Sequence, residues 1–494
     1  MNTQKTLFLF TTLFLAIVYC MSLYELRTAG IVLVLVCMGL PVFVKYTMEY
    51  TDVVLGLIIA TIGLCPFFVN VGIGPGTLRL YGEDIPTLYY VAYMVLAYGL
   101  LRRKPLHTGN IWLMLAFILF VMSASIPFFT NPIAKNALRN FAETFILGFA
   151  LYLIFYNETT DDNVDLFTAF IAWTTLALSV VVLLEVIFQA NPLMIKAKEV
   201  MDGFMYILPS RYTAIGSYYR PYAVFFHPSE AGTFLAMGFP FVQAYLRDKS
   251  PLLKYPLLAL ALLGVVLNYT RGVWLALAVA WTVCIFTRVR RVLPVLAVVF
   301  GVCLLGFLLV YGNTPFGKRI LDPTNMYNRL YYWQVGLAMT GDNFPFGIGH
   351  MNFEHRYLEY VDSAPVPQGL DVQQIFVADN MLLTSLVEQG VLGFATLCCF
   401  LGTVYYQLVK RIRLLRRQGH ERTARRCNIL LQATLVYLLA GMFADVHLFS
   451  KVTKLFFISI GMAFALMSLR AREDAQARTQ QEATGEIPAL DAAK

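Results

Sequence analysis

The chain has 494 residues, of which 58% are hydrophobic and 14% are charged, and its formal net charge is +8 at pH 7. A soluble domain carries about 25% charged residues, so the composition excludes an ordinary soluble protein and predicts a polytopic membrane protein. The positive charge does not indicate nucleic-acid binding, because the basic residues form short runs between apolar segments, as in cytoplasmic loops.

Apolar segments separated by polar residues predict an all-α bundle of about 14 transmembrane helices, since one spanning helix needs about 20 apolar residues. The first segment, "TLFLFTTLFLAIVYC", lacks a small-residue cleavage site, so we interpret it as a spanning helix and not as a removed signal peptide. The predicted helices cover residues 6–24, 28–46, 51–70, 86–101, 110–128, 139–156, 164–189, 222–246, 253–268, 271–288, 292–311, 380–409, 428–447 and 452–470.

Basic runs between these helices predict the orientation of the chain. Counting helices places all of the runs on one side, and both termini with them. Because Lys and Arg are enriched in cytoplasmic loops, we expect that side to be cytoplasmic. Residues 1–470 would then form the bundle, and the polar residues 471–494 a disordered cytoplasmic tail. The basic runs are 102–104, 247–250, 288–291, 410–417 and 470–472.

The opposite side, predicted to be periplasmic, carries two long loops at residues 190–221 and 312–378. A long loop without a helix of its own is usually functional or disordered. The aromatic residues of the second loop, and its short periodic pieces such as 328–340, argue against disorder. We therefore expect this loop to contain short helices.

Three arginines fall on the predicted periplasmic side. Arg220 lies in "SYYRPYAVFFHPSEAGTFLA", Arg271 begins "RGVWLALAVAWTVCIF", and Arg329 lies in "NMYNRLYYWQVGLAM". Arginine at the membrane usually faces a cavity or an anion, and its planar fork binds phosphate oxygens in pairs. Together the three residues predict a diphosphate site. The alternatives are snorkelling of Arg271 to the interface and pairing of the other two with loop carboxylates.

Two features surround these arginines. Trp274, close behind Arg271, suggests tight packing around a fixed guanidinium. The helix at 222–246 is expected to be broken by Pro228 and Gly232, and a broken spanning helix is tolerated only where protein or a cavity satisfies its backbone.

The stretch "FVADNMLLTSLVEQGVLGF" contains the candidate proton acceptor. Asp379 is placed to cap the helix that follows, and it is also placed to accept a proton beside the arginines. Asn380 and Glu388 are predicted to be supporting residues of the same site. An aspartate is a weak base, and neighbouring arginines lower its pKa further. His350 and His355 of the large loop are therefore alternative bases.

Ionisable residues in or near the predicted spans support a different function. Glu143, Glu185, Asp445 and His447 could line a proton path, as in a transporter. The eight cysteines show no zinc-site spacing, and the sequence predicts no metal and no cofactor.

Four segments resemble, in order, those of the O-antigen ligase and polymerase superfamily. The resemblance covers roughly residues 215–410, and the rest of the chain is similar only in being a series of helices. The segments are "RPYAVFFHPSEAGTFLAMGFP", "YTRGVWLAL", "NRLYYWQVGLAMTGDNFPFGIGHMNF" and "ADNMLLTSLVEQGVLGF".

The resemblance implies a bacterial inner-membrane enzyme whose helical bundle is capped by a periplasmic loop. Such enzymes move a glycan from a polyprenyl diphosphate carrier to an acceptor, with arginines holding the diphosphate, here Arg220, Arg271 and Arg329. The last family motif commonly begins with His-Asn, where this chain has Asp379 and Asn380. The upstream Pro-Asn is replaced by Pro-Ser-Glu at residues 228–230.

Three functions therefore stay open. The favoured one is metal-independent polymerisation of exopolysaccharide or O-antigen repeat units, partly because the family's histidine is absent. The second is ligation of a finished glycan to a lipid or protein acceptor, and the third is a polysaccharide flippase or transporter. The expected partners are the carrier-linked glycan, a glycan or lipid acceptor, membrane lipids and other polysaccharide export proteins.

Overall fold

The computed structural model describes most of the chain. The described residues are mainly helical, with two short hairpins. Three predicted helices, 6–24, 28–46 and 292–311, lie outside them, as do residues 192–213 and 312–323 of the two predicted loops. The described residues are 47, 49–65, 68–73, 76–81, 84–95, 105–132, 137–191, 214–215, 218–225, 227–286, 324–367, 370 and 378–484.

Within the described residues, five helical stretches are long and apolar enough to cross a membrane, so the chain is a multi-pass membrane protein. The total of about 14 spans stays a prediction, because part of the chain lies outside the described residues. The five stretches are Ile111–Thr130 (α5, Ile111–Ser125, with α6, Pro127–Thr130), Ala137–Glu158 (α7, Ala137–Phe141; the π-helical turn η3, Ala142–Ile146; α8, Leu147–Glu158), α9 (Val164–Phe188), α19 (Met381–Arg417) and Ser450–Ala477 of α21 (Ser450–Thr484).

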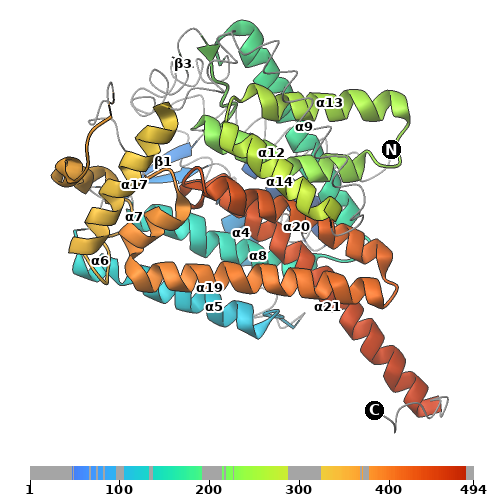
Figure 1. Cartoon of the computed structure of the whole chain (residues 1–494). Coiled ribbons are helices and arrows are strands. Elements are labelled where there is room, and N and C mark those ends of the chain that lie inside the picture. Colours follow the sequence, from blue (N-terminus) through green and yellow to red (C-terminus); the bar gives the residue numbers. More distant parts are fainter. Residues whose placement is uncertain are drawn as a thin grey trace.

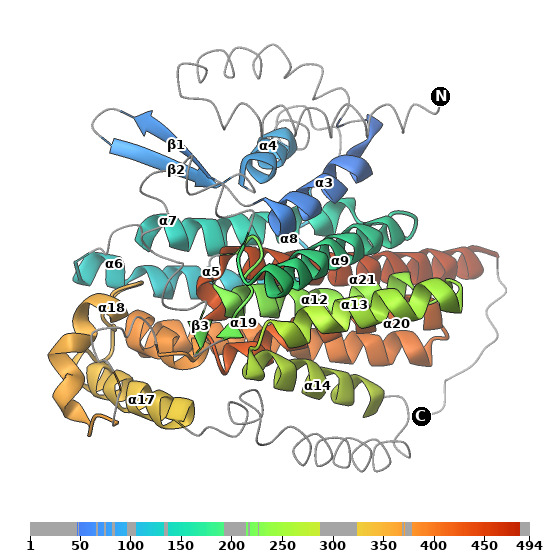
Figure 2. The same ribbon diagram turned by 90° about the horizontal axis from the view of Figure 1, so that it is seen from above.

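Six further helices of the described residues complete the bundle in Figure 2. Three of them are apolar, namely α3 (Thr51–Leu64), α13 (Pro251–Leu267) and α14 (Arg271–Phe286). The others in the bundle are α4 (Asp84–Met94), α12 (Pro228–Tyr245) and α20 (Glu421–Gly441).

Helix α21 is the central helix of the bundle. In its most apolar window 89% of the residues are buried, against 33–50% in the other four spans, which keep one face for lipid. α21 packs on α8 and α20, while α19 packs on α5 and α12 packs on α9. Close approach rather than water exclusion holds helices together in lipid. Accordingly, Gly148 of α8 lies against the ring of Phe457, and Gly461 of α21 lies against the backbone of Tyr152.

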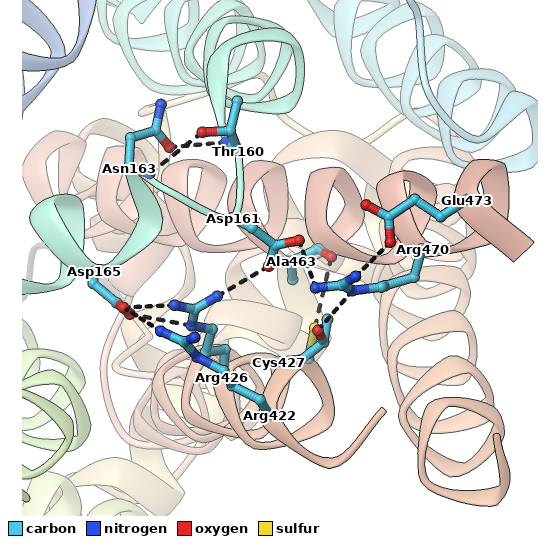
Figure 3. A network of polar contacts seen from close by, with 11 residues as sticks. Thr160, Asp161, Asn163, Asp165, Arg422, Arg426, Cys427, Ala463, Arg470 and Glu473 are labelled. Atoms are coloured by element: carbon cyan, nitrogen blue, oxygen red, sulfur yellow. Dashed lines mark hydrogen bonds and ion pairs between the residues drawn. The ribbon is translucent and has the colours of Figure 1, made fainter. Parts of the chain in front are cut away.

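One end of the bundle is tied by a network of ion pairs, shown in Figure 3. Arg426 at the start of α20 pairs with Asp161 and Asp165 just before and within the first turn of α9. Arg470 of α21 pairs with Asp161 at 2.7 Å, and Arg422 pairs with Asp165 at 3.3 Å. The network therefore joins three helices at the end that the basic runs predict to be cytoplasmic.

Helix α21 continues to Thr484 and its last part runs past the bundle in Figure 1, so residues 471–484, expected to be disordered, are helical. The sequence "AREDAQARTQQEAT" is rich in good helix formers. Because it extends an existing helix, it avoids the unfavourable step of nucleation.

The other end is capped by the loop between α14 and α19 (Figure 2). It contains α17 (Thr324–Asp342), α18 (Phe353–Arg356) and the 3-10 helix η5 (Tyr357–Ser363), which confirms the short helices expected within 312–378. The cap has its own apolar core, and through this core it packs on the start of α19. The core residues are Tyr331, Val335, Met339, Ile348, Phe353, Tyr357, Ala378 and Val387.

Two hairpins interrupt the helical pattern. β1 (Phe68–Ile73) pairs antiparallel with β2 (Gly76–Tyr81), and β3 (Ala214–Ile215) pairs with β4 (Tyr218–Tyr219). The helix predicted at 51–70 is therefore too long, since α3 ends at Leu64. Pro66 follows two residues later in the sequence, and proline disfavours helix both at its own position and at the residue before it.

Candidate functional site

Arg329 joins three segments at the capped end of the bundle. From α17 it donates through Nη2 to the carbonyl of Phe443, which follows α20, at 2.8 Å. Its Nε lies 3.4 Å from Oδ2 of Asp379, just before α19. The two side chains are 27% and 37% exposed, so this ion pair is open to a ligand. Trp333, one turn along α17, donates to the carbonyl of Ala378 and fixes the backbone before Asp379.

Asp379 does not cap α19, contrary to the sequence prediction. The cap is Asn380, whose Oδ1 accepts from the backbone N–H groups of Leu382 and Leu383 at 3.0 and 3.2 Å. Asp379 has a positive φ of 54°, in the left-handed region where aspartate is tolerated better than most residues. Its carboxylate is thereby directed to Arg329, and the helix obtains its cap from the next residue.

The segments that carry the other two arginines meet the same region. Nη2 of Arg220 lies 3.3 Å from Oγ1 of Thr270, the residue before Arg271. Gly272, the residue after it, lies against Phe443: an added Cβ would be 2.5 Å from the Cβ of Phe443. Arg329 binds the carbonyl of that same Phe443. All three arginine segments therefore converge around Thr270 and Phe443.

The electrostatic balance at Asp379 differs from the sequence expectation. Desolvation raises the pKa of Asp379 above its ordinary value, and the guanidinium groups of Arg329 and Arg220 offset this only in part. The expectation that the arginines would leave this pKa lowered was therefore wrong. Arg220 also acts on Asp379 directly, which places it near the Arg329–Asp379 pair.

Arg220 is positioned by a buried carboxylate. Glu185 near the end of α9 accepts hydrogen bonds from the backbone N–H of Tyr222 at 3.0 Å and from the hydroxyl of Tyr219 at 3.2 Å. It also accepts from Nδ2 of Asn191 at 3.0 Å. Glu185, expected as part of a transport path, thus holds the residues on either side of Arg220.

The expected break in helix 222–246 is not found. Residues 222–225 are irregular, and α12 begins with Pro228 at its first turn, where a proline needs no hydrogen bond. Gly232 lies inside α12, and its missing side chain leaves room for Asn268: an added Cβ would be 2.3 Å from Oδ1. Asn268 in turn donates to the carbonyl of Pro221 and accepts from Thr270.

The broken helix at this end is α19, which is interrupted at Gly390 with φ of 70°. There the carbonyls of Val387 and Glu388 accept from the N–H groups of Ile348 and Gly349, at 3.0 and 2.9 Å. Loop "FPFGIGH" (344–350) thus satisfies the backbone groups that the interruption frees. Gly347 makes this docking possible, since its Cβ would lie 2.4 Å from the backbone nitrogen of Gly390.

Docking of this loop places His350 beside Glu388. Nδ1 of His350 lies 3.5 Å from Oε2 of Glu388, and Nε2 lies 3.0 Å from Oδ1 of Asn140. His350 is 1% exposed, and burial lowers its pKa to about 4, so the ring is neutral at pH 7. His355, the alternative histidine, is exposed on α18.

Asp445 and His447, in the link between α20 and α21, also lie at this end. Asp445 is 3% exposed and His447, in the 3-10 turn η7 (Val446–Leu448), is 1% exposed. Burial and the Asp379 carboxylate raise the pKa of Asp445 to about 7, whereas Thr384, the Asp379 backbone N–H and Arg329 lower it. The sequence showed both residues as ionisable groups near a span, but nothing in it placed them beside Asp379.

The remaining predicted residues have structural contacts. Trp274 donates to the carbonyl of Val265 at 3.0 Å and ties α14 to α13. Glu143 pairs with Arg139 one turn earlier at 3.0 Å. Among the described residues, no group of three or more His, Cys, Asp or Glu has the arrangement of a metal site.

A family comparison covers the centre of this region. Residues 256–398 match the family model described as O-antigen ligase. These residues form an O-antigen ligase domain. The family comprises membrane ligases and polymerases that act on lipid-linked glycans. The domain contains Arg271, Arg329, His350 and Asp379, while Arg220 lies before it and Asp445 after it. No curated protein matches the chain.

Proposed function

We propose that this protein transfers a glycan from a polyprenyl diphosphate carrier to an acceptor hydroxyl at the capped end of the bundle. That end would face the periplasm of a bacterial inner membrane, with both termini in the cytoplasm. Other polysaccharide export proteins would act with it. The O-antigen ligase domain supplies the reaction class, and the polar residues around Phe443 supply the site.

Convergence of three arginine segments is the observation that carries this proposal. Arg220 contacts Thr270, Arg271 follows Thr270, and Arg329 binds the carbonyl of Phe443, on which Gly272 packs. A diphosphate needs several donors, and a charge-assisted hydrogen bond contributes about 1.5–3 kcal/mol. Arg220, Arg271 and Arg329 would hold the diphosphate and stabilise it as it leaves, which is electrostatic catalysis.

Asp379 is the better placed of the two candidate bases. Its side chain is 37% exposed beside Arg329, whereas His350 is buried and its ring nitrogens face Asn140 and Glu388. The acceptor hydroxyl would attack the anomeric carbon as its proton passes to Asp379. The bond between that carbon and the diphosphate breaks, and inversion follows from attack opposite the leaving group.

Polymerisation of exopolysaccharide or O-antigen repeat units is the favoured reaction, because Asp379 stands where the family commonly has histidine. The description of the matched family as ligase supports the second candidate, transfer of a finished glycan to a lipid or protein acceptor. A transporter is less well supported, since Glu143 and Glu185 have local structural partners.

The deciding experiment uses purified protein in lipid nanodiscs with a polyprenyl diphosphate-linked oligosaccharide. We expect a new glycosidic bond and one released polyprenyl diphosphate per bond. A ladder of products supports polymerisation, and a single product on an added acceptor supports ligation. Absence of any new bond in protein that still moves the carrier-linked glycan across the membrane would support the transporter instead.

A matched pair of substitutions tests whether Arg271 binds the diphosphate of the donor. Arg271→Lys keeps the charge and loses the planar fork, so the KM for the donor should rise about tenfold, equivalent to about 1.4 kcal/mol. Arg422→Lys is the control, because Arg422 is 73% exposed in the ion-pair network at the opposite end. Equal activity of the two variants would exclude two-point binding by Arg271.

A further inference from the structure

Next to Asp379 lies a buried cluster of ionisable side chains that have no role in the glycan transfer proposed above. Asp445 is within electrostatic reach of Asp379 and of Glu388, and His447 is within reach of His350. The cluster consists of Asp445, Glu388, His447 and His350, and each of these four side chains is at most 3% exposed. They come from the cap, from α19 and from the link between α20 and α21, so the cluster exists only in the folded chain.

This buried cluster is short of hydrogen-bond partners. Among the described residues, no hydrogen bond of normal geometry is found for either ring nitrogen of His447, for Oε2 of Glu388 or for either carboxylate oxygen of Asp445, although Thr384 and the N–H of Asp379 lie close enough to Asp445 to lower its pKa. The large majority of buried side-chain polar atoms in folded proteins have a hydrogen-bond partner, in the protein or in ordered water. The buried carboxylate of Asp445, which has no hydrogen bond of normal geometry and lies next to the exposed carboxylate of Asp379, is therefore suited to take up a proton.

The position of Asp445 is fixed by the site itself. It lies two residues after Phe443, whose carbonyl binds Arg329, and Arg329 also pairs with Asp379. The N–H of Leu448 donates to the carbonyl of Asp445 at 2.9 Å, which closes the turn that carries it. One arginine thus links the backbone beside Asp445 to the carboxylate of Asp379.

We propose that Asp379 and Asp445 act as a carboxylate pair in which Asp445 is the final proton acceptor for glycan transfer. Asp379 contacts the acceptor hydroxyl and passes its proton inward to Asp445. This inference rests on the transfer reaction proposed above. It assigns a role to Asp445 that the family match, which ends at residue 398, does not cover.

The pair resolves a difficulty with Asp379 acting alone. Burial raises the pKa of Asp379, but the guanidinium groups of Arg329 and Arg220 offset part of this rise and weaken its hold on a transferred proton. Two neighbouring carboxylates share one proton with an apparent pKa that belongs to the pair. Asp445 is the more deeply buried partner, at 3% exposed against 37% for the Asp379 side chain, and it is the one on which the proton settles.

The atoms of the step balance without a further reactant. The acceptor O–H bond breaks and its proton goes by way of Asp379 to Asp445, while the oxygen forms the new bond to the anomeric carbon. The carbon–oxygen bond to the diphosphate breaks, and its electron pair leaves with polyprenyl diphosphate. After product release the proton returns through Asp379 to the solvent, which restores the pair.

The prediction for pH follows from the ionised state of Asp445. It accepts a proton only as a carboxylate, and its pKa is raised to about 7. The rate should therefore fall as the pH drops through about 7. The charged and titratable groups facing it are Asp379 before α19, Glu388 in α19, Arg329 in α17 and His447 in η7.

The test is Asp445→Asn, which keeps the shape and removes the acceptor. We expect kcat to fall about 10²–10⁴-fold, with the donor KM unchanged and the acidic limb of the pH profile lost. Thr384→Val is the second variant, because it removes a hydroxyl that lowers the pKa of Asp445 and should move the acidic limb to higher pH. Asp165→Asn, in the opposite network, is the control and should keep the wild-type profile.

The outcomes separate this inference from the function on which it rests. Wild-type protein that forms no glycosidic bond overturns the transfer reaction itself. Active wild-type protein whose Asp445→Asn variant keeps the same kcat and the same acidic limb overturns only the role of Asp445. If Asp445→Asn does not fold, the Thr384→Val variant decides. An acidic limb of its pH–rate profile that stays at the wild-type pH would likewise overturn the role of Asp445.

Discussion

The two ends of the bundle use the same residue types in opposite ways. In the network of Figure 3, Arg426 lies against two aspartates and Arg470 against Asp161 and Glu473, so each charge meets an opposite one. At the capped end, Asp445 and His447 are buried, and among the described residues no hydrogen bond of normal geometry is found for either side chain. The 21-residue helix α20 separates the two ends by about 30 Å.

This difference indicates that the paired charges of the network stabilise the fold, whereas the buried charges at the capped end serve the proposed reaction. An exposed ion pair contributes about 0–1 kcal/mol to stability and needs no special environment. A buried carboxylate without a hydrogen bond of normal geometry costs several kcal/mol, and the cluster that contains Asp445 includes Glu388 and His350, which the docking of loop 344–350 on the interrupted α19 brings together. Substitutions at the two ends should therefore affect different properties.

Outside the buried cluster of Asp445, Arg329→Ala should have the largest effect, because Arg329 contacts both Asp379 and the Phe443 carbonyl. Losing one such donor at a reacting centre typically lowers kcat about 10²–10³-fold. The measurement is the initial rate of transfer at saturating donor. Arg329→Lys should recover only part of the rate, since a single ammonium does not bridge the two partners. Full recovery by lysine would mean that charge alone is sufficient.

Gly390→Ala should be next, because it disturbs the docking of loop 344–350. A side chain at φ of 70° costs about 1–2 kcal/mol, and the added Cβ would lie 2.2 Å from the carbonyl oxygen of Pro345. Displacing Glu388 and His350 by about 1 Å would lower the rate by up to about 10²-fold. Gly402→Ala, in the same helix with no atom within 4 Å of the added Cβ, is the control. Equal loss in both variants would indicate a general weakening of α19.

The limits of the sequence are clearest at this loop and helix. Hydrophobic segments of about 20 residues predicted most described helices, and the three arginines could be chosen because cations on that side are unusual. The interruption of α19 was not predictable, because it depends on Ile348 and Gly349 docking from a separate segment. Asp445 lies 66 positions after Asp379 in the sequence, and only the folding of α20 brings it near.

Glu185→Gln should have a moderate effect, confined to donor binding. Glu185 accepts from Tyr219, Tyr222 and Asn191, and an amide offers one acceptor oxygen in place of two. Losing about 1–2 kcal/mol of hydrogen bonding would loosen Arg220 and raise the donor KM roughly five- to thirtyfold. The control is Glu359→Gln, since Glu359 is 58% exposed in the cap. A fall in kcat with unchanged KM would place Glu185 in the chemical step instead.

Asp165→Asn should have the smallest effect, and on stability only. Asp165 is 59% exposed and pairs with Arg422 and Arg426, so its removal should lower the free energy of unfolding by less than about 1 kcal/mol. Because salt screens exposed charges, the difference from wild type should shrink as sodium chloride is raised, as followed by thermal unfolding in nanodiscs. Transfer activity should stay at the wild-type level throughout. A loss of activity here would mean that the two ends of the bundle are coupled through α20, and the separation of stabilising from reactive charges would no longer hold.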